Sequence, residues 1–488
     1  MIDYPSAVID VLPQVSETPA DESATVPWLA YGYGLVVALT LGHFLLGLPI
    51  QLSDSFGQML KLSGPWRDLL YGEFTQRGYM RPLMWGELKL IHDMSGGSYF
   101  AWFRGTHVVE ALTAVLLYVR LVRPRTYLDL CVLPLGLAVL VGLHTFQGTV
   151  REAFPLNHFL TVVIYTFLAA NLVMGRHRWW TDVLGVLLFV VSALTLESGL
   201  LVWVVLVGGM LTGGKGISRA GAGVLSALLA GYFILRFPVL GVGAPDLMER
   251  SSGFGFHILD PSELVARFGA NPYGFYLYNS VSSALSVLFS EPTGGVYGLT
   301  RQILAVELDL ASLISPIASA CATALVCVYV WRRRHAFLAW RLERDDQLVA
   351  LFAMVLAANA VISYPYTKDV VMSPAGAFLA VAVFAATRHV MAWLPDVTSP
   401  RNSAIILSVL LVTGATWAIR VTGTYLSLRR GAFVERNEWA YAEISLAEDR
   451  VVMSDVDKIL FRALREDALF THPAPPPLDP SLRIVLGE

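Results

Sequence analysis

The chain has 488 residues, of which 55% are hydrophobic and only 15% are charged, and its formal net charge is −3. Soluble domains carry about 25% charged residues, so this composition excludes an ordinary soluble globular protein. It predicts an all-α polytopic membrane protein whose main partner is the lipid bilayer, and no nucleic-acid partner is expected.

Apolar segments long enough to cross a bilayer recur along the whole chain. A spanning helix needs roughly 20 mostly apolar residues. Such windows occur about eleven times, near residues 28–48, 105–122, 128–145, 157–174, 182–196, 199–213, 220–237, 308–331, 348–363, 373–390 and 404–420.

Basic residues in the connections between these segments predict the orientation. Cytoplasmic loops of membrane proteins carry an excess of Lys and Arg. When the spans are counted, the basic clusters all fall on one side, which we assign to the cytoplasm: Arg120, Arg123, Arg125, Arg176, Arg178, Lys215, Arg219, Arg332, Arg333, Arg334, Arg341 and Arg344.

This orientation divides the chain into three parts. We expect a cytoplasmic tail at 1–27, a membrane domain at 28–420 with extracytoplasmic loops at 49–104 and 238–307, and a small extracytoplasmic tail at 421–488. A further span at 274–290 would move the cluster at 332–334 to the outside, so we place that segment in the membrane interface.

The first outer loop contains the stretch GYMRPLMWGELKLIHD at 78–93. Pro82 is suited to the first position of a helix, and Met84, Leu88 and Ile91 follow at the spacing of one helical face. Gly96 and Gly97 supply a stop. The pattern predicts a short amphipathic helix in the interface plane, with Glu87 and His92 on its solvent side. Two shorter helices are expected upstream, around 56–60 and over 66–71.

Ionisable residues gather at the outer ends of the spans. Such residues are costly in a membrane and mark functional sites. A transporter tends to place its polar site near the midplane, and a channel needs a polar stripe along several spans. The observed pattern instead favours an enzyme acting on a lipid-borne substrate at the outer face. The residues concerned are His107, Glu110, His144, Arg151, Glu152, His158, Glu197, Glu307, Asp309, Lys368 and Asp369.

Several of these side chains have a chemical and a structural interpretation. Asp54 could accept a proton from a hydroxyl nucleophile, or Asp54 or Ser53 could cap a helix that begins at residue 55. Arg81 has the forked donors suited to a phosphate, but it could also extend to lipid headgroups. Lys368 and Arg77 could neutralise a phosphate leaving group.

The remaining candidate residues also have more than one possible role. Glu197 could orient a base or hold an arginine. His107 and His158 with Glu110 resemble a metal set, but no HExxH-type spacing supports a metal, and structural hydrogen bonding is favoured.

The first part of the chain resembles the class C (GT-C) glycosyltransferases, polytopic enzymes that use polyprenyl-phosphate sugars, such as protein O-mannosyltransferases and aminoarabinose transferases. The resemblance covers about residues 28–200. LESG at 196–199 is similar to the family's Lys-Glu-(Thr/Gln)-Gly element, with Leu196 in place of the lysine, and a single acid at 54 stands where many relatives carry a pair. The other matching positions are Asp54, Gly78, Tyr79, Arg81, Pro82, Leu83 and His107.

The resemblance implies transfer of a hexosyl or pentosyl group from a polyprenyl-phosphate donor to an extracytoplasmic protein, lipid or polysaccharide, with inversion. Asp54 would be the catalytic base. Arg81, Lys368 and Arg77 would bind the donor phosphate, and the surrounding groups that orient them would be Glu197, Glu110, His107, His158 and Tyr79. The lipid-linked sugar would be the donor, no cofactor is otherwise implied, and the requirement for a divalent metal stays open because no residue pattern supports one.

The implied location is a bacterial inner or plasma membrane, with the active site facing outward. The alternatives are an O-antigen ligase or polymerase, and a flippase or transporter of lipid-linked sugars.

Overall fold

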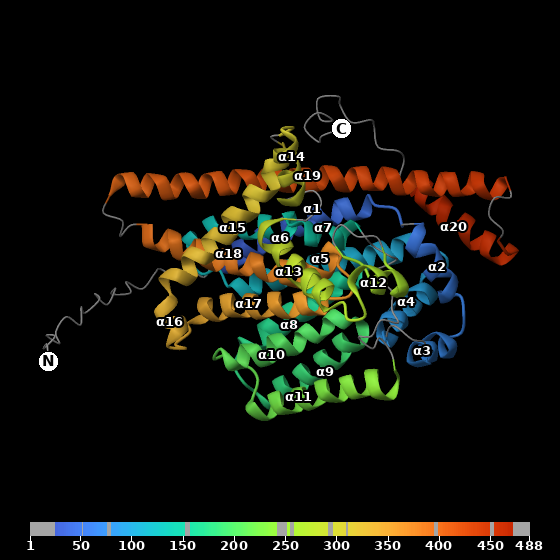
Figure 1. Ribbon diagram of the computed structural model, residues 1–488, viewed down its shortest axis with the longest axis horizontal. Coiled ribbons are helices and arrows are strands. Elements are labelled where there is room, and N and C mark those ends of the chain that lie inside the picture. Colours follow the sequence, from blue (N-terminus) through green and yellow to red (C-terminus); the bar gives the residue numbers. More distant parts are fainter. Residues whose placement is uncertain are drawn as a thin grey trace, which may run out of the picture.

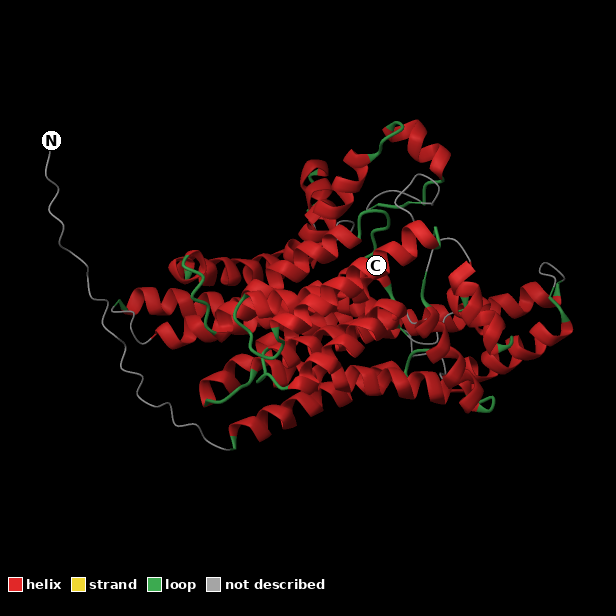
Figure 2. Cartoon of the chain, turned by 90° about the horizontal axis from the view of Figure 1, so that it is seen from below, coloured by secondary structure: helices red, strands yellow, loops and turns green. Residues whose placement is uncertain are grey.

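The computed structural model describes residues 25–50, 52–75, 80–151, 157–241, 251–253, 258–290, 296–308, 311–394, 399–448 and 453–471. In these ranges the chain is helical, with three isolated bridge pairs and no extended strand (Figure 2). The predicted all-helical architecture is therefore confirmed.

Seven helices of the described chain are long and apolar enough to cross a membrane. The coarse prediction of a multi-pass membrane protein is confirmed, although their number is smaller than eleven. The seven are α1 (Val26–Leu46), α5 (Tyr99–Val122), α11 (Arg219–Ile234) with the π-helical turn η2 (Leu235–Val239), α15 (Ile314–Arg332), α17 (Arg344–Ile362), the 3-10 turn η4 (Asp369–Met372) with α18 (Ser373–Trp393), and α19 (Pro400–Ala447).

The other four predicted segments also form helices. Helices α6 (Tyr127–Gly142) and α7 (His144–Arg151) meet at a bend of 62° and together could make an eighth span. Three shorter apolar helices follow: α8 (His158–Val173), α9 (Trp179–Thr195) and α10 (Leu201–Leu211), the last preceded by the 3-10 turn η1 (Glu197–Leu200). The number of eleven spans remains a prediction.

Helix α18 forms the centre of the bundle. Of its most apolar window, 94% is buried, a far larger share than in any other of the seven candidate spans. It packs against α6, α8, α15 and α17. Its sequence is rich in alanine, and small residues let neighbouring helices approach closely where no hydrophobic effect drives them together.

The segment 49–104, predicted as the first outer loop and called so below, contains three short helices, α2 (Ser53–Leu62), α3 (Trp66–Thr75) and α4 (Pro82–Ser95). Helix α4 begins at Pro82 and ends before Gly96, whose φ of 57° is readily adopted by glycine. Met84, Leu88 and Ile91 are buried, so the predicted start, stop and apolar face of this helix are all confirmed.

The later connections contain the remaining helices. They are α12 (Pro261–Phe268), α13 (Tyr273–Phe289), α14 (Val296–Ala305), the 3-10 turn η3 (Ala311–Leu313), α16 (Arg334–Leu338) and α20 (Asp455–Thr471). Helix α13 covers the segment 274–290 and packs against α15 and α17; its interfacial placement remains a prediction. Helix α19 continues without a break past residue 420, where the tail was expected to start.

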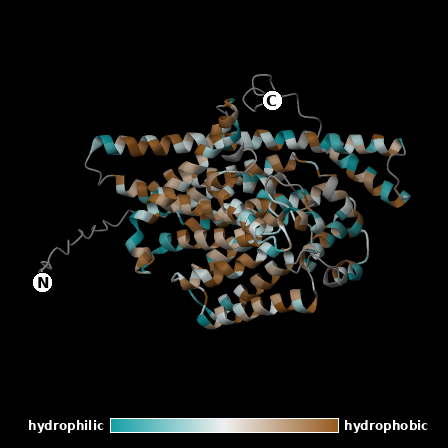
Figure 3. Cartoon of the chain, in the orientation of Figure 1, coloured by the Kyte–Doolittle hydropathy of each residue, from teal (hydrophilic) through white to brown (hydrophobic). Residues whose placement is uncertain are grey.

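The two ends of the bundle differ in character (Figure 1). The short helices α2, α3, α4 and α20 lie at one end, and α16 lies at the other. Hydrophilic residues gather toward both ends, while apolar residues run along the long helices (Figure 3).

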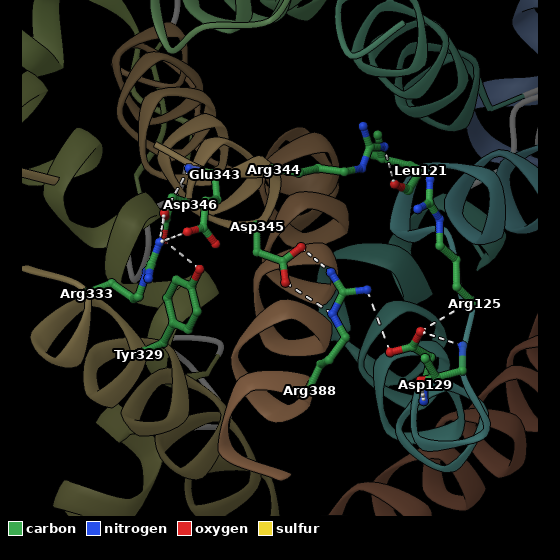
Figure 4. A network of polar contacts seen from close by, with 11 residues as sticks. Leu121, Arg125, Asp129, Tyr329, Arg333, Glu343, Arg344, Asp345, Asp346 and Arg388 are labelled. Carbon is green, nitrogen blue, oxygen red and sulfur yellow. Dashed lines mark hydrogen bonds and ion pairs between the residues drawn. The ribbon is translucent and has the colours of Figure 1, made fainter. Parts of the chain in front are cut away.

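The end near α16 holds a network of ion pairs between helix termini (Figure 4). Arg388 of α18 binds Asp345 of α17 and lies 3.7 Å from Asp129 of α6. Arg333, after α15, binds Asp346 at 2.8 Å, and this bond raises the pKa of the guanidinium. Arg125, Arg333 and Arg344, which belong to three of the predicted basic clusters, thus lie at the same end of the bundle (Figure 4).

Candidate functional site

Arg81 and Glu197 meet at the end of the bundle opposite this network. Arg81 precedes α4, and Glu197 opens the η1 turn between α9 and α10, 116 residues along the chain. The Arg81 Nε and Nη2 atoms donate to the Glu197 Oε2 atom at 2.9 and 2.6 Å. A charge-assisted contact made by two donors of one guanidinium fixes orientation as well as distance.

A second arginine shares the same carboxylate. Arg236 lies in the π-helical turn η2, its Nη1 atom is 3.3 Å from the Glu197 Oε1 atom, and it donates to the Tyr232 hydroxyl at 2.8 Å. Two guanidinium groups therefore share the carboxylate of Glu197. Arg236 was not among the site residues predicted from the sequence, although an arginine at the end of the apolar segment 220–237 is the kind of signal that marks a functional position.

Close packing around Gly199 explains why the LESG element ends in a glycine. A Cβ atom at this position would lie 1.9 Å from the carbonyl oxygen of Ser192 at the end of α9. The Ser192 hydroxyl also donates to the Gly199 carbonyl at 3.1 Å. The η1 turn that carries Glu197 is therefore folded back against α9 so closely that only glycine fits.

A second group of polar side chains lies on α5 and α8. The Thr161 hydroxyl donates to the Glu110 Oε1 atom at 2.6 Å, and Arg104 lies 3.3 Å from His107. The His158 Nε2 atom is 3.4 Å from Glu87 of α4. Because their separations on each helix are three residues, His107 and Glu110 share one face of α5, and His158 and Thr161 share one face of α8.

The predicted solvent-side location of Glu87 and His92 is wrong. Glu87 approaches His158, and the His92 ring stacks on Tyr99 with centroids 5.0 Å apart and is only 12% exposed. With 3.6 residues per turn, Glu87 and His92 lie about 140° apart and flank the apolar face of α4 on its two sides. Each therefore meets the element that packs beside that face, α8 for Glu87 and the start of α5 for His92.

Asp93 ties the end of α4 to α3. The Lys89 Nζ atom donates to it at 2.6 Å and the Trp66 indole donates at 2.9 Å. The bond from Lys89, followed by those from His92 and Trp66, lowers the pKa of the carboxyl. The packing of α3 on α4 therefore includes a carboxylate that is stabilised in its charged form.

Lys368 and its neighbour Asp369 lie at the turn between α17 and α18. The Lys368 ammonium lies over the Tyr366 ring, 5.6 Å from its centroid. Asp369 opens η4 and lies 3.7 Å from His144 of α7, whose other ring nitrogen is 3.2 Å from Arg420 of α19. This turn thus joins α7, α18 and α19 by charged groups.

Three predicted site residues lie wholly or partly outside the described structure. Arg77 and Tyr79 are outside the described residues, and for Asp54 only the backbone is described. That backbone lies in the first turn of α2, which begins at Ser53. The alternative in which Asp54 or Ser53 caps a helix starting at residue 55 is wrong, because the helix starts two residues earlier.

No group of three or more His, Cys, Asp or Glu residues that could hold a metal ion occurs in the described part of the chain. His107, Glu110 and His158, the set considered from the sequence, have Arg104, Thr161 and Glu87 as neighbours.

A comparison of the chain with protein-family models, curated proteins and solved structures finds no match.

Chemically, the Arg81–Glu197–Arg236 cluster is suited to receiving an anion. The Arg81 side chain is 23% exposed, whereas that of Arg236 is 9% exposed. An anionic group would therefore reach the guanidinium of Arg81 more readily than that of Arg236.

Proposed function

We propose that the protein is an integral-membrane glycosyltransferase with the architecture of the class C enzymes, in which all eleven apolar segments cross the membrane. It would transfer a sugar from a polyprenyl-phosphate donor to an extracytoplasmic acceptor. The observation that carries this proposal is the Arg81–Glu197–Arg236 cluster, which joins the first outer loop to two span ends.

The cluster suits the leaving group of such a transfer. As the glycosidic bond breaks, negative charge grows on the lipid phosphate, and a fixed cation aimed at that charge lowers the barrier. Arg81 has forked donors for phosphate oxygens, and Glu197 holds it in one orientation. Lys368 and Arg77 would add to the positive field.

Asp54 would be the general base. The acceptor hydroxyl oxygen forms a bond to the anomeric carbon while its proton passes to the Asp54 carboxylate. The bond between that carbon and the phosphate oxygen breaks, and its electron pair leaves with the phosphate, so the configuration inverts. Glu110, His107, His158 and Tyr79 would orient the groups around this centre.

The experiment compares lipid-linked sugars and glycans by mass spectrometry between cells with and without the gene, followed by transfer assays on the purified protein. Asp54→Asn should abolish transfer while the protein still inserts and purifies. Asp68→Asn is the matched control, because Asp68 is an exposed acid in the first turn of the neighbouring helix α3. Full activity of Asp54→Asn would contradict the base assignment.

The ion-pair network near α16 favours an enzyme over a carrier. Alternating access requires the helices at each end to separate in turn, and this network joins α6, α17 and α18. In a variant with its native cysteines replaced, Asp345→Cys and Arg388→Cys would be joined by a flexible thiol cross-linker that can be cleaved. Sugar transfer should continue in the cross-linked protein. An activity that is lost on cross-linking and returns when the cross-link is cleaved would show that α17 and α18 must separate at this end, as in a carrier.

A further inference from the structure

We propose that the C-terminal helix pair α19–α20 positions the α2 helix, and that Trp439 is the residue through which it acts. The part of this proposal that concerns the role of Asp54 rests on the proposed function. The part that concerns the position of α2 rests on the contacts of α19 and α20 alone.

The linker that leads from α1 into α2 is held at three successive carbonyl groups. Arg104 of α5 donates from Nε to the Leu48 carbonyl at 2.8 Å and from Nη2 to the Pro49 carbonyl at 2.5 Å. The Trp439 indole of α19 donates to the Ile50 carbonyl at 2.6 Å. Arg104 is 1% exposed and Trp439 is fully buried.

These hydrogen bonds determine the path of the linker. A buried backbone carbonyl outside regular structure must find a donor, and here the donors come from two distant helices. Because α2 begins at Ser53, only three residues after Ile50, fixing this linker also fixes where α2 starts.

The same helix pair also contacts α2 itself. Phe56 packs edge-on against the Trp439 ring at 6.3 Å and against the Phe461 ring of α20 at 5.6 Å, and these two rings lie 5.5 Å apart. Phe56 follows Asp54 by two residues. The backbone that carries Asp54 thus runs between a hydrogen bond and an aromatic contact made by the same side chain, Trp439.

These contacts belong to a separate apolar cluster that joins the C-terminal helices to the first outer loop. It is distinct from the main core of the spans, so the residues beyond the last predicted span complete the packing of the loop. Its buried members are Ile50, Phe56, Met59, Leu62, Met84, Trp85, Leu88, Ile91, Phe100, Phe103, Trp439, Phe461, Leu464 and Ala468.

Trp439→Phe tests the proposal, because it removes the indole donor and keeps a ring. Trp417→Phe is the matched control: Trp417 is also fully buried on α19, and its indole donates to the Ala318 carbonyl at 3.0 Å, away from α2. Phe461→Leu is a second variant in case Trp439→Phe does not fold, since it alters only the aromatic contact.

Two readouts on the full-length protein in detergent decide the outcome. Backbone amides of α2 should exchange with deuterium faster in Trp439→Phe and Phe461→Leu than in the wild type, and should be unchanged in Trp417→Phe. In the transfer assay, kcat should fall on the order of 10-fold to 100-fold with little change in the donor KM, because a misplaced base costs rate more than binding.

The two proposals fail in distinguishable ways. Unchanged exchange in α2 in both variants, or an equal effect of Trp417→Phe, overturns the positioning role. Faster exchange in α2 together with full activity of Asp54→Asn would leave Trp439 as the residue that positions α2 and would overturn Asp54 as the base.

Discussion

Replacing Glu197 by glutamine tests whether the carboxylate between Arg81 and Arg236 holds the first outer loop on the bundle. The substitution keeps the shape of the side chain and removes its charge. Removing one partner of a buried ion pair costs about 3–5 kcal/mol, and the amide keeps one acceptor, so we expect a loss of about 2–3 kcal/mol in the free energy of unfolding. The side chains of Arg81 and Glu197 are 23% and 18% exposed, so solvent weakens the pair only in part.

The assay is denaturant unfolding of the purified protein in mixed micelles. Glu443→Gln is the control, because Glu443 pairs with Arg465 at a more exposed position between α19 and α20. Such surface pairs contribute about 1 kcal/mol or less. A double-mutant cycle with Arg81→Gln should give a coupling energy of about 1–3 kcal/mol.

One result would refute this reasoning. If Glu197→Gln destabilises the protein no more than Glu443→Gln, and its effect simply adds to that of Arg81→Gln, then the pair does not hold α4 against the η1 turn.

Three other substitutions test neighbouring features. Gly199→Ala should lower the free energy of unfolding by about 1–3 kcal/mol, since its Cβ would overlap the α9 backbone, whereas Gly223→Ala, with open space around it, should not. Thr161→Val should cost about 1–3 kcal/mol because it leaves the Glu110 carboxyl without its hydroxyl donor, and Thr161→Ser should restore stability. The pKa of Asp93 is lowered in the folded protein, so its stabilising contribution is present at neutral pH and is lost as the pH falls from about 4 through the lower pKa of the folded state. The difference in thermal stability between wild type and Asp93→Asn should disappear below that folded-state pKa.

Local features were predictable from the sequence because their causes are local. Pro82, the spacing of Met84, Leu88 and Ile91, and the glycine pair at 96–97 give α4 its start, face and end. The same holds for the apolar segments, each of which folds as a helix.

Contacts between residues far apart in the sequence could not be predicted from local patterns. Arg81 and Glu197 were each candidates, but nothing within one sequence joins two residues that are 116 positions apart. Glu87 and His92 flank the apolar face of α4, and their contacts with His158 and Tyr99 depend on how α4 packs against α5 and α8. The contact of Trp439 with the Ile50 carbonyl depends on where α19 crosses the first loop, which no local pattern specifies.

Three of the candidate groups share one backbone feature, which is that they lie where α-helix gives way to another backbone conformation. Glu197 opens a 3-10 turn, Arg236 lies in a π-helical turn, and Asp369 opens another 3-10 turn beside Lys368. Irregular backbone at the depth of a membrane is tolerated where it is buried in protein or lines a polar cavity, and π-helical turns often occur at functional sites. The end near α16, in contrast, is closed by ion pairs between helix termini. A bundle that is fixed at one end and irregular at the other can hold a reaction centre at the irregular end without moving as a whole, and this asymmetry is what we expect of an enzyme whose lipid-borne substrate enters from one leaflet.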